Sequence, residues 1–258
     1  MMTAFGLLTL VACEAPPIDW SGSQVASPLG GPMQLSVDGR VHLDTLTANG
    51  NGAVAPPDAC PGSLRVARGA QSLVAVWWSV RPDSGADLVF GRLAADGASW
   101  QVVSRVDTTD HGVSGCRRAA ASVAFDAASG YVHVSYGLVA AEGPGVFFSH
   151  SMDGGATFHS PVPIVYGEHP GQTTVAASGD VVVVAFEDPN GSAARVGLAL
   201  SRSMGHIFER RVLPVSGDNG AATVPLAAVQ GSRVAVAWEE RGGSNGAAAV
   251  RIRTGSLH

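Results

Sequence analysis

Charged and imidazole side chains gather in a few Gly- and Pro-rich segments of the chain, and these are its candidates for chemistry. The candidates for contact with a ligand are Asp110, His111, Arg117, Arg118, Glu168, His169, Glu187, Asp188, Glu239 and Glu240. Paired carboxylates can serve as the acid and the nucleophile of glycoside hydrolysis, and an arginine pair can bind an anionic group. As a weak alternative, His111 and His169, each beside a carboxylate, could hold zinc or copper. We expect no metal or other cofactor.

The stretch SHSMDGGATFHSP at 149–161 is a further candidate, because it places one carboxylate between glycines and hydroxyl residues. It could be a catalytic loop, a calcium loop or a structural turn. The regular series of Asp and Asn ligands of a calcium loop is absent from it. An aspartate can accept N–H groups of its own turn, and glycine permits positive φ. The residue types therefore favour a structural turn.

The elements around these segments form an internal repeat. Four β-branched runs end in an aromatic residue and predict strands: LVAVWW (73–78), VHVSY (132–136), VVVAF (182–186) and VAVAW (234–238). A second aromatic follows each of the first three at the same interval of 22 positions (78 to 100, 136 to 158 and 186 to 208). A constant interval across segments of different composition indicates a real repeat.

Each repeat is interpreted as four strands. In the middle unit they lie at 121–126, 131–137, 145–151 and 159–165, and Pro161 and Pro163 suit an outer strand, where a missing N–H donor is tolerated. Sustained helical periodicity is absent. We therefore predict an all-β fold, a β-propeller of four-stranded antiparallel blades.

One segment carries a resemblance to a known family. Ser151, Asp153, Gly155, Thr157 and Phe158 fill every defined position of a turn that resembles the Asp-box (S/T-x-D-x-G-x-T-W/F) of sialidase-like, BNR-repeat propellers. Weaker copies contain Asp96 and Trp100 in the preceding unit, and Ser201, Gly205 and Phe208 in the following one. The resemblance covers roughly 60–258. It implies that the boxes join the third and fourth strands on the face opposite the substrate site.

The other face then collects the fourth-to-first and second-to-third connections, which contain the ten ligand-face candidates. A sialidase mechanism would need a Tyr nucleophile activated by Glu, an Asp, and three arginines that bind the sugar carboxylate. The family's Phe/Tyr-Arg-Ile-Pro motif does not occur in the chain. Of the tyrosines, Tyr136 is expected in the core, Tyr131 at the start of a strand and Tyr166 on a loop.

The fourth repeat stops before its outer strand. We expect the N-terminal segment PMQLSVDGRVHL (32–43) to supply that strand and to close a four-bladed ring, which would remove exposed strand edges. The alternative is a truncated form of a larger propeller. The predicted organisation is a signal peptide with a lipobox (1–13), a flexible tether (14–32) and the propeller domain (33–258).

The N-terminus predicts export. The apolar run 4–12 is too short to span a bilayer, and Leu10-Val11-Ala12-Cys13 resembles the bacterial lipobox, which would make Cys13 the lipidated residue. No Lys or Arg precedes the run; a plain secretory signal and an N-terminal strand are the alternatives. In an exported protein the two other cysteines, Cys60 and Cys116, are expected to form a disulfide.

Composition restricts the partners. The chain has 258 residues, a net charge of −5 and no run of Lys or Arg, so a nucleic-acid partner is not expected. We expect a non-catalytic binding protein, lipid-anchored at the cell envelope or outer surface, that recognises a glycan or a protein. A divergent, exo-sialidase-like glycoside hydrolase and a metal-binding or envelope-assembly lipoprotein are the alternatives.

Overall fold

The computed structural model describes residues 16–26, 33–38, 41–43, 55–216, 220–242 and 248–258, and every helix or strand in these ranges is a β-strand. The predicted signal segment 1–13, with Cys13, lies outside the described residues. Within the described residues, no helix is long and apolar enough to cross a membrane.

Three antiparallel sheets of four strands follow one another along the chain, each with its strands in sequence order. The first sheet contains β5 (Arg65–Arg68), β6 (Leu73–Val80), β7 (Ala86–Leu93) and β8 (Trp100–Asp107). The second contains β9 (Ser122–Phe125), β10 (Val132–Ala140), β11 (Gly143–Ser151) and β12 (Val162–Tyr166). The third contains β13 (Thr173–Ser178), β14 (Val181–Glu187), β15 (Val196–Ser201) and β16 (Arg210–Pro214). The predicted four-strand units are confirmed.

The fourth sheet combines both ends of the described chain. It contains β17 (Ala221–Gln230), β18 (Arg233–Arg241) and β19 (Ala249–Leu257), and its outer position is filled by β1 (Ile18–Trp20) and β2 (Gln24–Ala26), both antiparallel to β19. An N-terminal segment therefore supplies the outer strand, as predicted.

The segment that supplies it differs from the one predicted. Residues 18–26 were expected in a flexible tether, but they pair with β19, and Ile18 is buried against the fourth sheet. The expected segment instead forms a separate hairpin of β3 (Met33–Leu35) and β4 (Val41–Leu43). Ile18 and Trp20 lie two residues apart and both pack against this core, the alternation of a half-buried strand.

The sheets pack face to face, and the two faces of one strand serve two cores. In β6, Val74, Val76 and Trp78 pack against the second sheet, while Ala75 and Trp77 belong to a separate cluster on the far face. Equivalent clusters join the second sheet to the third, and the third to the fourth. Burial on both faces explains why these strands are continuous apolar runs without alternation.

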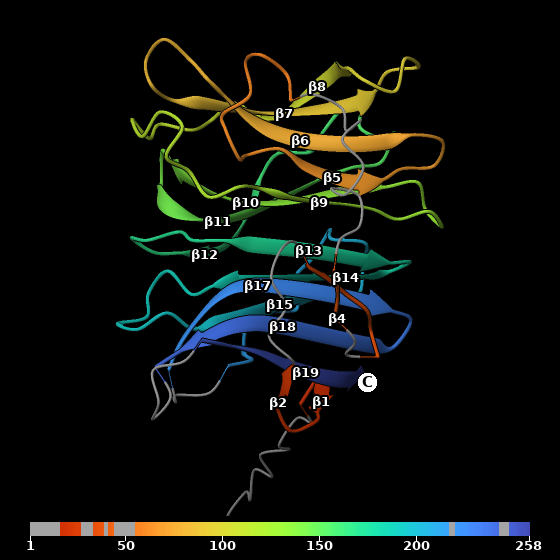
Figure 1. Ribbon diagram of the computed structural model, residues 1–258, viewed down its shortest axis with the longest axis vertical. Coiled ribbons are helices and arrows are strands. Elements are labelled where there is room, and N and C mark those ends of the chain that lie inside the picture. The colour runs from red at the N-terminus through yellow and green to blue at the C-terminus, as the bar shows by residue number, and fades with distance from the viewer. Residues whose placement is uncertain (1–15, 27–32, 39–40, 44–54, 217–219, 243–247) are drawn as a thin grey trace, which may run out of the picture.

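Segments from the N-terminal part of the chain cover the outer faces of the two end sheets. Ala59 and Leu64 pack over Trp77 on the first sheet, and Ala26 and Leu35 pack over the cluster of Val250 on the fourth. Figure 1 shows the sheets in chain order along the longest axis, with the first and fourth at opposite ends. A ring closed by contact of these two sheets is thus not shown for the described residues.

Candidate functional site

The second-to-third and fourth-to-first connections meet at one end of the sheets, as expected, and we call this end the loop face. Arg81, after β6, donates to the carbonyl oxygens of Thr108 and Asp110 in the β8–β9 connection, at 2.9 and 2.5 Å. In the third sheet, Asn190 donates from its side chain to the carbonyl of Tyr166, at 2.7 Å. The loops are therefore tied to one another by side chains.

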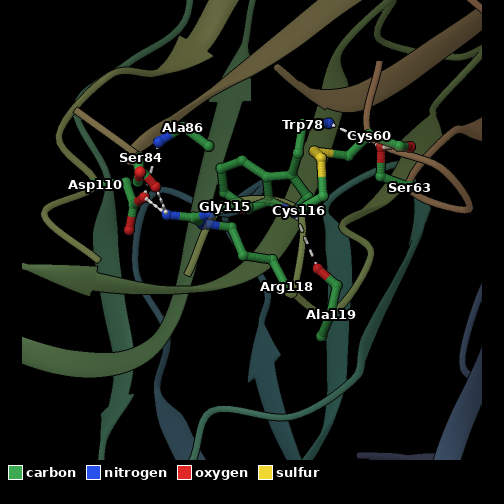
Figure 2. Close-up of a disulfide and its surroundings, with 10 residues drawn as sticks. All are labelled: Cys60, Ser63, Trp78, Ser84, Ala86, Asp110, Gly115, Cys116, Arg118 and Ala119. Atoms are coloured by element: carbon green, nitrogen blue, oxygen red, sulfur yellow. Dashed lines mark hydrogen bonds and ion pairs between the residues drawn. A yellow bond between two sulfur atoms is a disulfide. The ribbon is translucent and has the colours of Figure 1, made fainter. Parts of the chain in front are cut away.

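Two of the predicted ligand-binding residues form a buried ion pair. Asp110 is 1% exposed, and a carboxylate oxygen lies 2.5 Å from a guanidinium nitrogen of Arg118. The same carboxylate accepts the backbone N–H groups of Ala86 and Gly112, at 3.0 and 3.2 Å. Figure 2 shows the guanidinium of Arg118 directed at the carboxylate of Asp110. Because its charges and hydrogen bonds are used internally, the pair holds the 107–118 loop in place.

Arg118 also satisfies the carbonyl groups of that loop. It donates to the carbonyl oxygens of Ser84, Gly112 and Gly115, in addition to Asp110. Arginine suits this position because its planar guanidinium offers several N–H donors in a fixed geometry. The predicted anion-binding role of the Arg117–Arg118 pair therefore rests on Arg117 alone, which is exposed.

A disulfide joins Cys60 and Cys116 next to this pair, as predicted, with 5.2 Å between the Cα atoms. Trp78 lies between the disulfide and the Asp110–Arg118 pair (Figure 2). Its indole N–H donates to the carbonyl of Ala119 at 2.9 Å, and its backbone carbonyl accepts the N–H of Cys60 at 2.8 Å. The disulfide thus joins the segment 59–64, which covers the outer face of the first sheet, to the 107–118 loop.

Glu187 joins the third sheet to the fourth. One oxygen of its carboxylate accepts the N–H of Gln172 at 3.1 Å, and the other accepts the N–H of Val224 at 2.8 Å. Val224 has φ of +52° and lies at the irregularity between β17 and β18, so Glu187 supports a strained backbone position. The predicted ligand-face carboxylate therefore has a structural use.

The remaining acidic candidates divide into partnered and exposed groups. Glu240 pairs with Arg251 at 3.1 Å, and Asp188 accepts the N–H of Asn190 at 3.0 Å. Glu239 has a contact of 3.5 Å with Arg241, and Glu168 is exposed. His111, Arg117 and His169 are exposed as well. Among the described residues, no three His, Cys, Asp or Glu side chains are placed to hold a metal ion.

A buried tyrosine and a carboxylate form a pair beneath the loop face. The hydroxyl of Tyr136 donates to Asp107 at 2.6 Å, and neither residue is more than 4% exposed. Burial, together with the negative charge of Asp107, raises the pKa of Tyr136 well above its ordinary value of 10. A tyrosine nucleophile needs the opposite change, so this pair stabilises the core, as was expected for Tyr136.

At the other end of the sheets, which we call the box face, the segment 151–158 joins β11 to β12 as a hydrogen-bonded turn. The carboxylate of Asp153 accepts the N–H and the hydroxyl of Thr157, at 2.9 and 2.7 Å, and the hydroxyl of Ser151 at 2.7 Å. Phe158 packs edge-on against Phe90 of the first sheet, with ring centroids 5.5 Å apart. In the structure, this stretch is therefore a hydrogen-bonded turn that packs on the first sheet.

The turn 201–208 of the third sheet repeats this geometry without the carboxylate. The N–H of Ile207 donates to the hydroxyl of Ser203 at 3.0 Å, as Thr157 does to Asp153. Phe208 packs edge-on against Phe148 of the second sheet at 5.0 Å. In the first sheet, Asp96 accepts the N–H of Ser99 at 3.0 Å in a shorter turn. The turns of the second and third sheets thus share one geometry, and the first sheet has a shorter turn that is also held by an aspartate.

Sequence reasoning missed a cluster of histidines beside these turns. His133 and His150 are direct partners across β10 and β11. His159 and His206 lie against His150, at ring-centroid distances of 4.5 and 4.6 Å. The tight β10–β11 turn at 141–142 fixes the register and could have predicted the first pair.

Two clefts lie on the box face. One lies at the junction of the first two sheets and is lined by Gln71, Ser72, Arg92, Gly130 and Gly154. Arg92 crosses this junction and donates to the carbonyl of Gly154 at 2.6 Å. Arg92 is the one ionisable residue that lines this cleft, so the cleft lacks the convergent ionisable groups that mark a catalytic site.

Comparison with solved structures shows the fold. The Hadza microbial sialidase Hz136 matches with a TM-score of 0.51 and 16% identity, over 76% of this chain and 46% of the sialidase. The Bombyx mori GH32 β-fructofuranosidase BmSUC1 matches with a TM-score of 0.50 and 12% identity, over 75% of this chain and 44% of the enzyme. This chain therefore has a β-propeller fold, and its match covers less than half of either enzyme.

The comparison with protein-family models and the comparison with curated proteins found no match.

Proposed function

We propose that this chain is a non-catalytic binding protein that recognises a glycan through the loop face. The fold shared with a sialidase and a β-fructofuranosidase supports a glycan over a protein ligand. The loop face offers a rigid support, because the Asp110–Arg118 pair and the Cys60–Cys116 disulfide fix its longest connection. Preorganised loops lower the entropic cost of binding.

The observation that carries the non-catalytic interpretation is the engagement of the buried and half-buried ionisable groups on this face. Asp107 accepts the Tyr136 hydroxyl, Asp110 faces Arg118, and Glu187 accepts two backbone N–H groups. A retaining or inverting glycosidase needs two carboxyl groups that face the scissile bond. Among the described residues, the buried carboxylates of this face are used to hold loops and strands.

The exposed residues His111, Arg117, Glu168 and His169 are the proposed contacts. Arginine and histidine donate hydrogen bonds to sugar hydroxyls and carboxylates, and a glutamate accepts from hydroxyls. A charged or hydroxyl-rich sugar is therefore the ligand class that these residues suit best. The Asp110–Arg118 pair would act indirectly, by holding the loop that carries His111 and Arg117.

The alternative is a divergent glycoside hydrolase, which the fold likeness supports about equally. In that case the exposed Glu168 would be one of the carboxylates that act on the sugar. We also propose that the protein is exported and anchored through a lipid on Cys13. The disulfide supports export, because disulfides persist in oxidising compartments.

Binding and turnover separate these two functions. On a glycan array, we expect the full chain to bind a subset of glycans, and Arg117→Ala to weaken that binding about tenfold, as for the loss of one charge-assisted hydrogen bond. Arg233→Ala is the matched control, because Arg233 is exposed at the first-to-second connection of the fourth sheet, on the other end. Equal loss in both variants would contradict a site on the loop face.

The enzymatic alternative is tested with aryl glycosides. We expect no release of the aryl group by the wild-type chain. Turnover that disappears in Glu168→Gln, while the melting temperature stays unchanged, would overturn the non-catalytic interpretation. Glu168 is suitable because it is exposed, and its replacement leaves the internal ion pairs intact.

A further inference from the structure

Four histidines from the second and third sheets meet on the box face. His133 and His150 are cross-strand partners, 0% and 3% exposed, with ring centroids 6.3 Å apart. His159, after the turn 151–158, stacks on His150 at 4.5 Å. His206, from the turn 201–208 of the third sheet, meets His150 edge-on at 4.6 Å. The cluster therefore spans the junction between the two sheets.

The surroundings of the two buried rings favour neutral imidazole. Both ring nitrogens of His133 and Nε2 of His150 are buried without a hydrogen-bond partner among the described residues. Phe148 stacks on His133, and Tyr131 stacks on His150. A charged imidazolium needs hydrogen bonds or an opposite charge when it is removed from water.

Among the described residues, one acidic group that acts on the cluster is Asp126. Asp126, at the end of β9, favours the charged form of His133. Its carboxylate is already engaged, because it accepts the hydroxyl of Ser129 at 2.6 Å and the N–H of Gly179 at 3.2 Å. The titratable groups that face the cluster from β11, from the following turn and from the third sheet include further histidines, and the ring of Tyr131 stacks on His150. Charging one ring therefore places it next to rings that can gain the same charge.

The same contacts join the sheets. Gly205, in the turn that carries His206, has φ of +87° and lies where an added Cβ would be 2.5 Å from the Phe148 ring and 3.7 Å from Nδ1 of His133. Phe208 of the same turn packs on Phe148. Hence, if the ring of His133 or His150 becomes hydrated or moves away from His206, the packing of the turn 201–208 is also disturbed.

We propose that this histidine cluster is a pH-sensitive lock between the second and third sheets. At neutral pH the uncharged rings pack together and hold the turn 201–208 against β10 and β11. On acidification the rings take up protons, repel one another, and release this turn from the second sheet. Metal binding is not the role that the geometry supports, because His150 and His159 stack nearly parallel, at 19°, and do not point at a common centre.

The pH range follows from the two buried rings. Burial is the main cause that lowers the pKa of His133 to about 4 and that of His150 to about 4, from the ordinary value of 6.5. A depressed folded pKa means that the unfolded or opened state binds protons more readily. The stability is therefore fully present above pH 6.5 and is lost as the pH falls toward 4. Each ring lowers the ratio of closed to open protein by up to about tenfold per pH unit in this range.

Chemical unfolding of the full chain between pH 7.5 and 4.5 tests the proposal. We expect the wild type to lose stability steadily below pH 6.5, and the double variant His133→Phe/His150→Phe to lose much less. Phenylalanine keeps a flat ring, and the buried nitrogens that it removes make no hydrogen bonds among the described residues. His111→Gln/His169→Gln, on the loop face, is the matched control and should follow the wild type. Identical pH curves for the wild type and the His133/His150 variant would overturn the proposal.

Two measurements on the wild-type chain remain decisive if the double variant does not fold. Histidine side-chain NMR should show two of the eight histidines still neutral at pH 5, whereas eight midpoints near 6.5 would contradict the lock. Hydrogen exchange, corrected for the intrinsic effect of pH, should show residues 201–208 losing protection between pH 7 and 5 before β6 and β7 do. Loss of protection at the same pH in all sheets would show that acid does not open this junction first.

Discussion

On the loop face, the carboxylate of Asp110 is buried, opposes the guanidinium of Arg118, and accepts backbone N–H groups. On the box face, the carboxylate of Asp153 is exposed and is held by the N–H and hydroxyl of Thr157 and by the hydroxyl of Ser151. Both aspartates organise a loop. They differ in whether the charge is buried away from water. This determines how much stability is lost when the aspartate or its partner is replaced.

The third sheet shows what the second arrangement tolerates. In the turn 201–208, the hydroxyl of Ser203 takes the place of the Asp153 carboxylate, and the aromatic residue at the end still packs on the preceding sheet. In an exposed turn, a neutral hydroxyl can replace a carboxylate, because water can solvate either group. A buried ion pair has no such freedom, since removal of one member leaves the other unpaired.

The largest effect is therefore expected at the loop face. Arg118→Ala should lower the free energy of unfolding by about 3–5 kcal/mol, because Asp110 would remain buried without its partner. Asp110→Asn/Arg118→Met should recover a large part of this loss, since it removes both charges. Urea unfolding at pH 7 measures both variants. A loss below about 1 kcal/mol for Arg118→Ala would show that water reaches Asp110 and that the contrast between the two faces is smaller than inferred.

The sequence predicted the repeating parts of this molecule and failed where single contacts decide. The strand order, the disulfide and the turn 151–158 follow from periodicity, cysteine pairing and turn chemistry, all of which are local or repeated. The outer strand of the fourth sheet was assigned to 32–43 instead of 18–26. Both segments have strand character, and only packing against β19 distinguishes them.

The candidate site was predicted by type of residue but not by role. Asp110, Arg118 and Glu187 were selected because they are charged and lie in loops, and the structure shows that they hold those loops. No local pattern separates a buried charge from an exposed one, because burial depends on the neighbouring strands and connections that fold over it. The histidine cluster was missed for the same reason, since His206 comes from a different sheet.

A smaller loss of stability is expected where the turn 151–158 of the box face approaches the first sheet. Gly155 has φ of +97°, and an added Cβ would lie 2.0 Å from the Phe90 ring, so Gly155→Ala combines backbone strain with overpacking. We expect a loss of about 2–4 kcal/mol. Gly179→Ala is the control, because φ there is +59° but nothing lies within 4 Å of the added atom, and it should cost about 1–2 kcal/mol. Equal losses would mean that Phe90 moves aside and that the approach of the turn adds nothing.

The smallest loss of stability is expected when Asp153 of the turn 151–158 is replaced by the serine found at the equivalent place in the turn 201–208. Asp153→Ser imitates the third sheet, where Ser203 holds the turn, so it should lower the melting temperature by no more than about 2 °C at pH 7.

The pH dependence of this difference follows from the pKa of Asp153. The hydrogen bond from the Thr157 N–H, followed by those from the hydroxyls, lowers the pKa of Asp153 well below its ordinary 3.8. A depressed carboxylate pKa gives stability that is present above pH 3.8 and is lost as the pH falls further. The difference between the wild type and Asp153→Ser should therefore be constant from pH 7 to about 4.5 and shrink only below that, whereas the histidine cluster acts between 6.5 and 4. Calorimetry of both proteins across this pH range measures the difference in melting temperature. A difference that already shrinks at pH 6 would mean that the contribution of Asp153 depends on the charge of the neighbouring histidines. The Asp153 turn and the histidine cluster would then be coupled.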